Sequence, residues 1–257
     1  MTKNIDFAEI DKDVSSKNFF DLLEKYDIEA CRPYIKSLAD KRNYMLLSHD
    51  LFVNTVESLR KRVQETSAKK IEELNRSGYC SFGSSDTKQW NTLIDGYEIG
   101  FQDMLRKTAW DFFHYARLTI DMYLQIINVS ILDKPYPDEE VRFSKLKSSI
   151  EPYKDMVSFL EDNEKNTEYK YILSFDNYMK HINEVPIDVK MNSSGLFDFT
   201  EMALEEVYIH SFSYKEQNYE MVKATDKISS ARDYTVKTTS RFLRILLAEQ
   251  TRRMEGR

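Results

Sequence analysis

The sequence predicts a mainly α-helical protein organised around a helical bundle. Three observations support this fold class. The chain of 257 residues contains only six glycines and five prolines, so long regular elements with few tight turns are expected. Apolar residues recur over long stretches at the three- and four-residue steps of a helix. Aromatic residues make up 13% of the chain, which is typical of a packed core and not of a disordered segment.

The N-terminal hundred residues are expected to be helical. Residues 6–25 have the pattern of an amphipathic helix, and Pro33 suits the first turn of a second helix that continues to about Asn75. The segment SGYCSFGSSD contains two glycines and is interpreted as the loop that returns the chain from a long helical hairpin. The apolar side of the first helix would carry Phe7, Ile10, Val14, Phe19, Leu22 and Leu23.

The middle of the chain contains the most apolar helical pattern, from Asp103 to about Leu132. The sequence PYPD should end this helix, because two prolines within three residues cannot continue it. Another helix is predicted over Glu139–Leu160. The next is predicted over Glu168–Glu184, where it stops before Pro186.

The stretch from Pro186 to Tyr214 is the least helical part of the chain. Its sequence VYIHSFSY alternates between apolar and polar residues and predicts a short strand or β-hairpin. A last amphipathic helix is expected over Gln217–Glu249. The expected organisation is an N-terminal helical hairpin over residues 1–100 and a bundle of four or five helices over 101–257, joined in one compact unit.

Composition narrows the classes of function. The net charge is −6, with 43 acidic against 37 basic residues, which argues against a dedicated binder of duplex DNA. Cys31 and Cys80 lack the spacing of a disulfide framework or a zinc site. No pattern for a metal or cofactor is found, and no apolar run has membrane-spanning length. With no signal-peptide pattern at the N-terminus, we expect a cytoplasmic protein without a membrane partner.

A narrow polar stripe follows the apolar helix that begins at Asp103. Steps of three and four residues place its members on one face of the helix. Unpaired buried polar groups cost a few kcal/mol each, about 1–3 kcal/mol in proteins, so the stripe must have partners. It is either an internal hydrogen-bond ladder, with Arg117 and Asp121 paired, or the lining of a cleft that faces a ligand. The stripe consists of His114, Arg117, Asp121, Gln125 and Asn128.

A second distinctive segment, YILSFDNYMKHINEV, holds Asn177, Lys180 and His181 on one helical turn. Together with FFHYARLTIDMYLQIINV upstream, it resembles the HEPN superfamily, and in particular a branch with a degenerate motif. The similarity covers roughly residues 101–247. The usual HEPN mark is an arginine and a polar residue followed by a histidine on the same helix. Here Asp176 occupies the arginine position.

The resemblance implies an all-helical fold, pairing of two copies through the motif-bearing helices, and roles in bacterial defence or toxin systems. Active members are thought to cleave RNA without a metal, the histidine transferring protons and the arginine stabilising phosphate charge. By this resemblance His181 and Lys180 would be catalytic. Asn177, Arg117, Asp121 and His114 would bind the RNA or nucleotide. A carboxylate at position 176 would instead repel phosphate, and lysine does not replace the bidentate arginine.

Two functions therefore stay open. The first is a HEPN-like RNA- or nucleotide-binding protein, either a weak metal-independent endoribonuclease or a binder that has lost cleavage. The second is a non-enzymatic helical interaction module that pairs as a homodimer. Arg42, Asn43 and His49 also match the HEPN pattern at its longest spacing, but Arg42 and His49 are expected to face solvent two turns apart on a long helix. His210 is expected to be structural.

Overall fold

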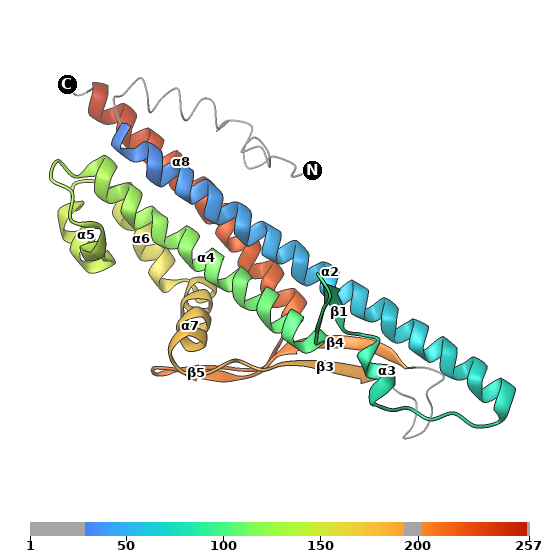
Figure 1. Ribbon diagram of the computed structural model, residues 1–257. Coiled ribbons are helices and arrows are strands. Elements are labelled where there is room, and N and C mark those ends of the chain that lie inside the picture. Colours follow the sequence, from blue (N-terminus) through green and yellow to red (C-terminus); the bar gives the residue numbers. More distant parts are fainter. Residues whose placement is uncertain (1–28, 193–201, 256–257) are drawn as a thin grey trace. The chain divides into compact units, whose positions relative to one another are not determined.

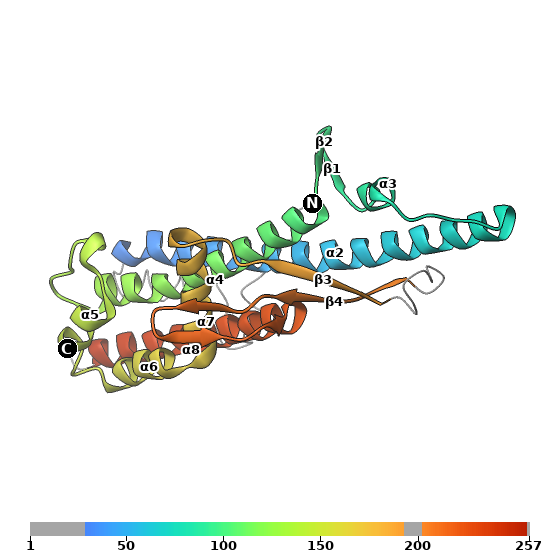
Figure 2. The same cartoon turned by 90° about the horizontal axis from the view of Figure 1, so that it is seen from below.

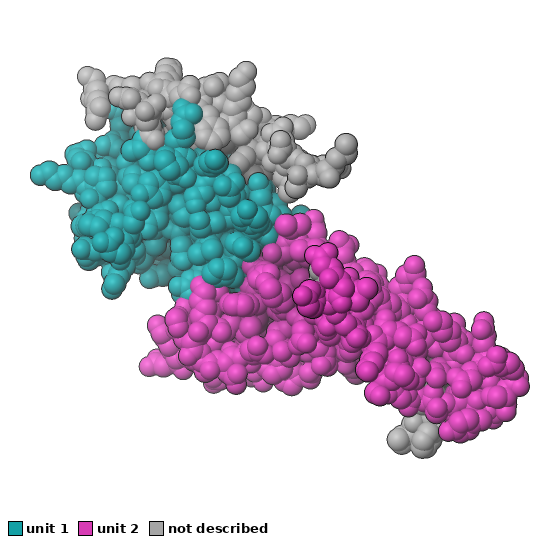
Figure 3. Space-filling model, in the orientation of Figure 1, with its two compact units in different colours: residues 1–46, 113–173, 230–257 teal, residues 47–112, 174–229 magenta. Residues whose placement is uncertain are grey.

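The computed structural model describes residues 29–192 and 202–255 (Figure 1). The helix expected over 6–25 lies outside these residues. The chain divides into two compact units that interleave along the sequence (Figure 3). Unit 1 comprises Met1–Leu46, Phe113–Leu173 and Ser230–Arg257, and unit 2 comprises Leu47–Phe112 and Ser174–Ser229. The predicted division of the chain near residue 100 stays a prediction.

Four long helices dominate the described residues and confirm the mainly helical fold class. They are α2 (Arg32–Ser77), α4 (Phe101–Ile131), α7 (Thr167–His181) and α8 (Ala224–Glu255). A short 3-10 helix, η2 (Glu29–Cys31), precedes α2. The boundary between the units falls inside all four long helices. Within the described residues, none of the helices combines the length and the apolar character needed to cross a membrane.

Aromatic side chains form the core of unit 1. The Tyr123 and Phe242 rings stack with their centroids 4.7 Å apart, and Phe159 lies 5.8 Å from Tyr123 and 5.6 Å from Phe242. The Tyr123 hydroxyl shares a hydrogen bond of 2.7 Å with the Thr239 hydroxyl. Ile120 and Ile127 of α4 are buried, as expected for the central helix of the bundle.

The helix predicted over Glu139–Leu160 is interrupted in the structure. This stretch begins within η3 (Asp138–Glu140), continues through α5 (Phe143–Ser149) and ends within α6 (Lys154–Lys165). Pro152 accounts for the second break, because a proline disfavours helical geometry in the residue before it and lacks the backbone N–H that a helix interior needs. The predicted break at PYPD is confirmed, since α4 ends at Ile131.

Unit 2 contains a β-hairpin that the sequence reasoning missed. After the short helix α3 (Ser84–Lys88), strands β1 (Thr92–Ile94) and β2 (Tyr97–Ile99) pair antiparallel. Asp95 and Gly96 form the turn with φ of 48° and 84°. This left-handed geometry fits the type I′ turn that Asp-Gly favours between two strands.

The region after α7 is a set of antiparallel strands, which confirms the prediction of strand structure there (Figure 2). A three-stranded sheet has the order β3-β4-β7, and β5 and β6 form a separate hairpin. Strand structure extends further than predicted, so α8 begins at Ala224 and not near Gln217. The strands are β3 (Ile187–Asn192), β4 (Ala203–Ile209), β5 (Phe212–Tyr214), β6 (Gln217–Tyr219) and β7 (Val222–Lys223).

Candidate functional site

The last two turns of α7 carry the residues that resemble the HEPN motif. Asp176 is completely buried, and one of its carboxylate oxygens accepts a hydrogen bond of 2.7 Å from Nζ of Lys180. The pair has the i,i+4 spacing that brings side chains together on one helix face. The Lys180 side chain is 30% exposed, so its charged end reaches inward to the carboxylate. Asn177 is half-buried and His181 is exposed.

This geometry gives the end of α7 little attraction for phosphate. The Lys180 charge is already compensated by a carboxylate that the helix holds in place. The C-terminal end of a helix carries partial negative charge, which also disfavours an anion. A further carboxylate, Glu184, follows the helix and forms an ion pair of 2.8 Å with Arg106. The one group here that is exposed and chemically versatile is His181.

The polar stripe of α4 acts in large part as an internal ladder. The Asn128 side chain is completely buried, donates to the Tyr136 carbonyl at 2.8 Å and accepts from the Tyr136 amide at 2.8 Å. The Gln125 amide donates to the Asp138 carbonyl at 3.0 Å. These bonds hold the proline-containing segment against the helix. For Gln125 and Asn128 the structural interpretation of the stripe therefore applies.

Three of the four predicted binding residues lie in the N-terminal part of the stripe: His114, Arg117 and Asp121. Nε of Arg117 lies 3.3 Å from the Asp121 carboxylate, as the i,i+4 spacing predicts. The His114 ring is 5.5 Å from that of Tyr115. These residues belong to unit 1, whereas Asn177, Lys180 and His181 belong to unit 2. The meeting of the two groups in one site stays a prediction.

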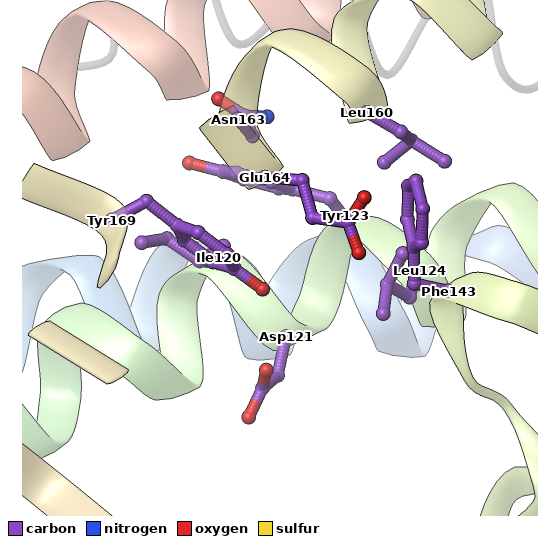
Figure 4. Close-up of a pocket in the computed structure, with 9 residues that line it drawn as sticks. All are labelled: Ile120, Asp121, Tyr123, Leu124, Phe143, Leu160, Asn163, Glu164 and Tyr169. Atoms are coloured by element: carbon purple, nitrogen blue, oxygen red, sulfur yellow. The ribbon is translucent and has the colours of Figure 1, made fainter. Parts of the chain in front are cut away.

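A small pocket lies beside the stripe within unit 1 (Figure 4). The space inside it that water-sized molecules can occupy is only about 20 Å³. Figure 4 shows the Tyr169 hydroxyl directed toward the side where Asp121 lies. Burial, together with the Asp121 and Glu164 carboxylates, raises the pKa of Tyr169 to about 12. The lining residues are Ile120, Asp121, Tyr123, Leu124, Phe143, Leu160, Asn163, Glu164 and Tyr169.

The pocket has apolar walls and acidic groups, which is the reverse of a phosphate site. Sequence reasoning identified Asp121 but missed Glu164 and Tyr169. These two lie at the end of α6 and the start of α7, while Asp121 lies on α4. No spacing within the sequence connects residues on three different helices.

Two further predictions concern the second match to the HEPN pattern, at Arg42, Asn43 and His49, and the role of His210. Arg42 of the competing match is buried, with 3% of its surface exposed, so the expectation that it faces solvent is wrong. Nδ1 of His49 is 2.9 Å from the Asp50 carboxylate, and the side chain is 14% exposed. His210 pairs with Asp188 at 2.5 Å, which fits the structural role expected for it.

Comparison of the chain with protein-family models, with curated proteins and with solved structures finds no match. Among the residues that the structure describes, no three His, Cys, Asp or Glu side chains gather as a metal site would require.

Proposed function

We propose that this chain is a non-enzymatic helical interaction module of HEPN-like architecture, which pairs with a second copy of itself through unit 2. One observation carries the proposal. Of the nine large apolar side chains that are exposed in the described residues, eight belong to unit 2 and only Tyr44 belongs to unit 1. The eight are Leu47, Leu51, Leu74, Tyr79, Leu93, Tyr97, Ile182 and Met221.

The β1–β2 hairpin is the strongest part of this surface. Leu93 is 72% exposed and Tyr97 is 76% exposed. In the hairpin register Leu93 lies opposite Glu98, and Tyr97 lies opposite Ile94, so the two exposed side chains project from opposite faces. A two-stranded hairpin is marginally stable alone, and burial against a partner would stabilise it. A hairpin with an exposed apolar side chain on each face presents apolar surface that a partner would bury.

The end of α7 supports the non-enzymatic part of the proposal. HEPN catalysis, as the resemblance implies it, requires a cation directed at a phosphate. In this chain Asp176 replaces that arginine and engages Lys180 at 2.7 Å. Because Asp176 is completely buried, the pair is part of the packing of α7 and is not a mobile surface contact.

The test is the oligomeric state of the protein at tens of micromolar, measured by sedimentation velocity or light scattering. We expect a dimer for the natural chain and a monomer for the double variant Leu93→Ser, Tyr97→Ser. Tyr44→Ser is the matched control, because Tyr44 is 52% exposed but belongs to unit 1. A monomeric natural chain, or a double variant that still pairs, would contradict the proposal.

A second candidate is binding of RNA or a nucleotide at Asn177, Lys180 and His181, with weak metal-independent cleavage. The observation that favours RNA binding is that His181 is exposed at the end of α7. If this candidate is right, His181→Ala abolishes cleavage and a chelator leaves it intact. His210→Ala is the control, because this histidine is bound to Asp188. Equal RNA binding and cleavage in all three proteins would remove the candidate.

The HEPN pattern has an arginine where this chain has Asp176, so Asp176→Arg is the obvious variant for testing phosphate binding. It is a poor test. Asp176→Arg would place a long cation in a fully buried position, so a loss of function would report only misfolding. The double variant Asp176→Asn, Lys180→Met is better, because it removes the lysine and its buried charge partner together. If Lys180 contacts phosphate, this change weakens RNA binding and reduces the dependence of binding on salt.

A further inference from the structure

The pocket of unit 1 contains two polar groups that lack hydrogen-bond partners among the described residues. Asn163 is only 7% exposed, and its Oδ1 accepts a hydrogen bond of 2.8 Å from the Tyr234 hydroxyl. The Nδ2 atom of the same amide has no partner. The hydroxyl of Tyr169, which also lines the pocket, forms no hydrogen bond with another described residue. A buried donor without a partner destabilises a fold unless a bound molecule accepts its hydrogen bond.

The exposed side of the same pocket is acidic. Glu164 is exposed and forms no ion pair within the described part of the chain. The Asp121 carboxylate lies 3.3 Å from Nε of Arg117, so its charge is compensated. One net negative charge therefore remains at the pocket. Burial, helped by the two carboxylates, raises the pKa of Tyr169 to about 12, so its hydroxyl stays uncharged at neutral pH.

The size of the pocket limits what it can hold. The space open to water-sized molecules is about 20 Å³, and one water needs about 10–15 Å³ on this measure. The buried end beside Asn163 therefore has room for one small polar group, such as a hydroxyl. In the view of Figure 4, Asn163 lies at one end of the pocket and Asp121 at the other, with Glu164 and Tyr169 between them. A ligand that reaches both Asn163 and Glu164 needs a hydrogen-bond acceptor and a cation only a few atoms apart.

We infer that this pocket binds a small amino alcohol, a molecule whose primary ammonium group and hydroxyl group are joined by a short carbon chain. The ligand hydroxyl fills the water-sized space and accepts a hydrogen bond from Nδ2 of Asn163. The ammonium group pairs with the Glu164 carboxylate and donates to the Tyr169 oxygen. The carbon atoms contact the apolar wall formed by Ile120 and Leu124. All of these residues belong to unit 1, so the site is independent of the pairing proposed for unit 2.

The main test follows the Nδ2 amide of Asn163 by nuclear magnetic resonance in isotope-labelled protein. Its resonance is the one missing from Asn163→Asp, which keeps an oxygen to accept the Tyr234 hydrogen bond. Titration with ethanolamine should shift this resonance saturably, with a millimolar dissociation constant, because a molecule of so few atoms binds weakly. Ethylamine lacks the hydroxyl and should bind about fivefold more weakly. Glycolate has the hydroxyl but a negative charge, and it should leave the resonance in place.

Three results of this titration would overturn the inference. Equal affinities for ethanolamine and ethylamine would mean that Asn163 does not recognise the hydroxyl. A saturable shift of similar size with glycolate would mean that the acidic side does not select a cation. The absence of any saturable shift with ethanolamine would mean that the pocket holds only water.

The carboxylate is tested by Glu164→Gln, which keeps the size of the side chain and removes its charge. Ethanolamine should bind to this variant about fivefold more weakly, as expected for the loss of one partly solvated ion pair. Glu161→Gln is the matched control. Glu161 is on the same helix and carries the same charge, but it is paired with Lys147 at 2.5 Å and does not line the pocket. Equal losses of affinity in the two variants would show only a general effect of net charge and would overturn the assignment of Glu164.

The hydroxyl of Tyr169 is tested by Tyr169→Phe, with stability as a second measurement. Because this hydroxyl has no partner among the described residues, its removal should leave the midpoint of urea unfolding unchanged while ethanolamine binds about fivefold more weakly. Tyr234→Phe is the control, since it removes the bond to Asn163 and should lower the midpoint. If Tyr169→Phe lowered the midpoint as much as Tyr234→Phe and kept the natural affinity, the hydroxyl would be structural and the inference would fail.

Discussion

The two compact units differ in how many of their large apolar side chains are exposed to solvent. Unit 1 buries an aromatic core of Tyr123, Phe159 and Phe242 and satisfies the Asn128 side chain with two hydrogen bonds. Unit 2 keeps eight large apolar side chains exposed and is built partly from two- and three-stranded β elements. Apolar burial dominates folding stability, whereas exposed apolar surface serves binding. Unit 2 also has a buried core, with Phe52, Phe112 and Phe175 at most 1% exposed, so the two units differ in their surfaces and not in whether they have a core.

The largest expected contrast is in stability. Phe159→Ala should lower the free energy of unfolding by about 3–5 kcal/mol, because it opens a cavity between Tyr123 and Phe242. Leu93→Ala in unit 2 should change it by less than about 0.5 kcal/mol, since Leu93 is 72% exposed. Urea unfolding followed by circular dichroism measures both. If the two variants lost similar amounts of unfolding free energy, the contrast between the buried Phe159 and the exposed Leu93 would be wrong.

The two cysteines, one in each unit, allow the burial of the two units to be compared through the reactivity of their thiols. Burial raises the pKa of Cys31, in unit 1, from 9.0 to about 11, although a hydrogen bond with Ser130 partly opposes this. Cys80, in unit 2, is half-buried. At pH 8 we expect Cys31 to react with a disulfide reagent at least about a hundredfold more slowly than Cys80, because the thiolate is the nucleophile. The Cys80→Ser variant isolates the slow phase, and a fast Cys31 would refute the expectation.

The same shift gives a dependence of stability on pH. Because the Cys31 pKa is higher in the folded protein, its contribution is fully present below pH 9 and is lost as the pH rises from 9 toward 11. The fall in the free energy of unfolding over this range should therefore be smaller in Cys31→Ala than in the natural chain. An identical slope in the two proteins would contradict the assignment.

The smallest effect concerns the hydrogen-bond ladder of α4. Asn128→Ala leaves the Tyr136 amide and carbonyl without their partners and should cost about 2 kcal/mol. Gln125→Ala removes one bond from a less buried position and should cost less than about 1 kcal/mol. Amide hydrogen exchange at Tyr136 sharpens the test, because it should accelerate in Asn128→Ala alone. Unchanged exchange would mean that Asn128 does not hold this segment.

Sequence reasoning predicted the long helices well because their apolar residues repeat over many turns, as in α2 and α4. It missed the break caused by Pro152, and it missed the β1–β2 hairpin although Asp95-Gly96 is a strong local turn signal. Both signals were present in the sequence and were outweighed by the helical pattern around them. Short elements lack the repetition that makes periodicity informative.

The candidate site was less predictable because it depends on burial. The i,i+4 spacing of Asp176 and Lys180 is visible in the sequence, but the complete burial of Asp176 follows from tertiary packing. The same holds for Arg42, whose burial the charged residues around it do not indicate. The pocket beside Asp121 needs Glu164 and Tyr169 from two other helices, and no local pattern links them.

The outer edge of strand β3 affects whether other chains can add strands to the β3-β4-β7 sheet. β3 lies at the end of the sheet order, where an edge strand can template strand addition by other chains. It carries exposed Asp188 and Lys190, and the register shifts between Lys190 and Met191. Edge charges and a β-bulge both hinder further strands from joining. These two features of β3 therefore oppose open-ended addition of strands at this edge of the sheet.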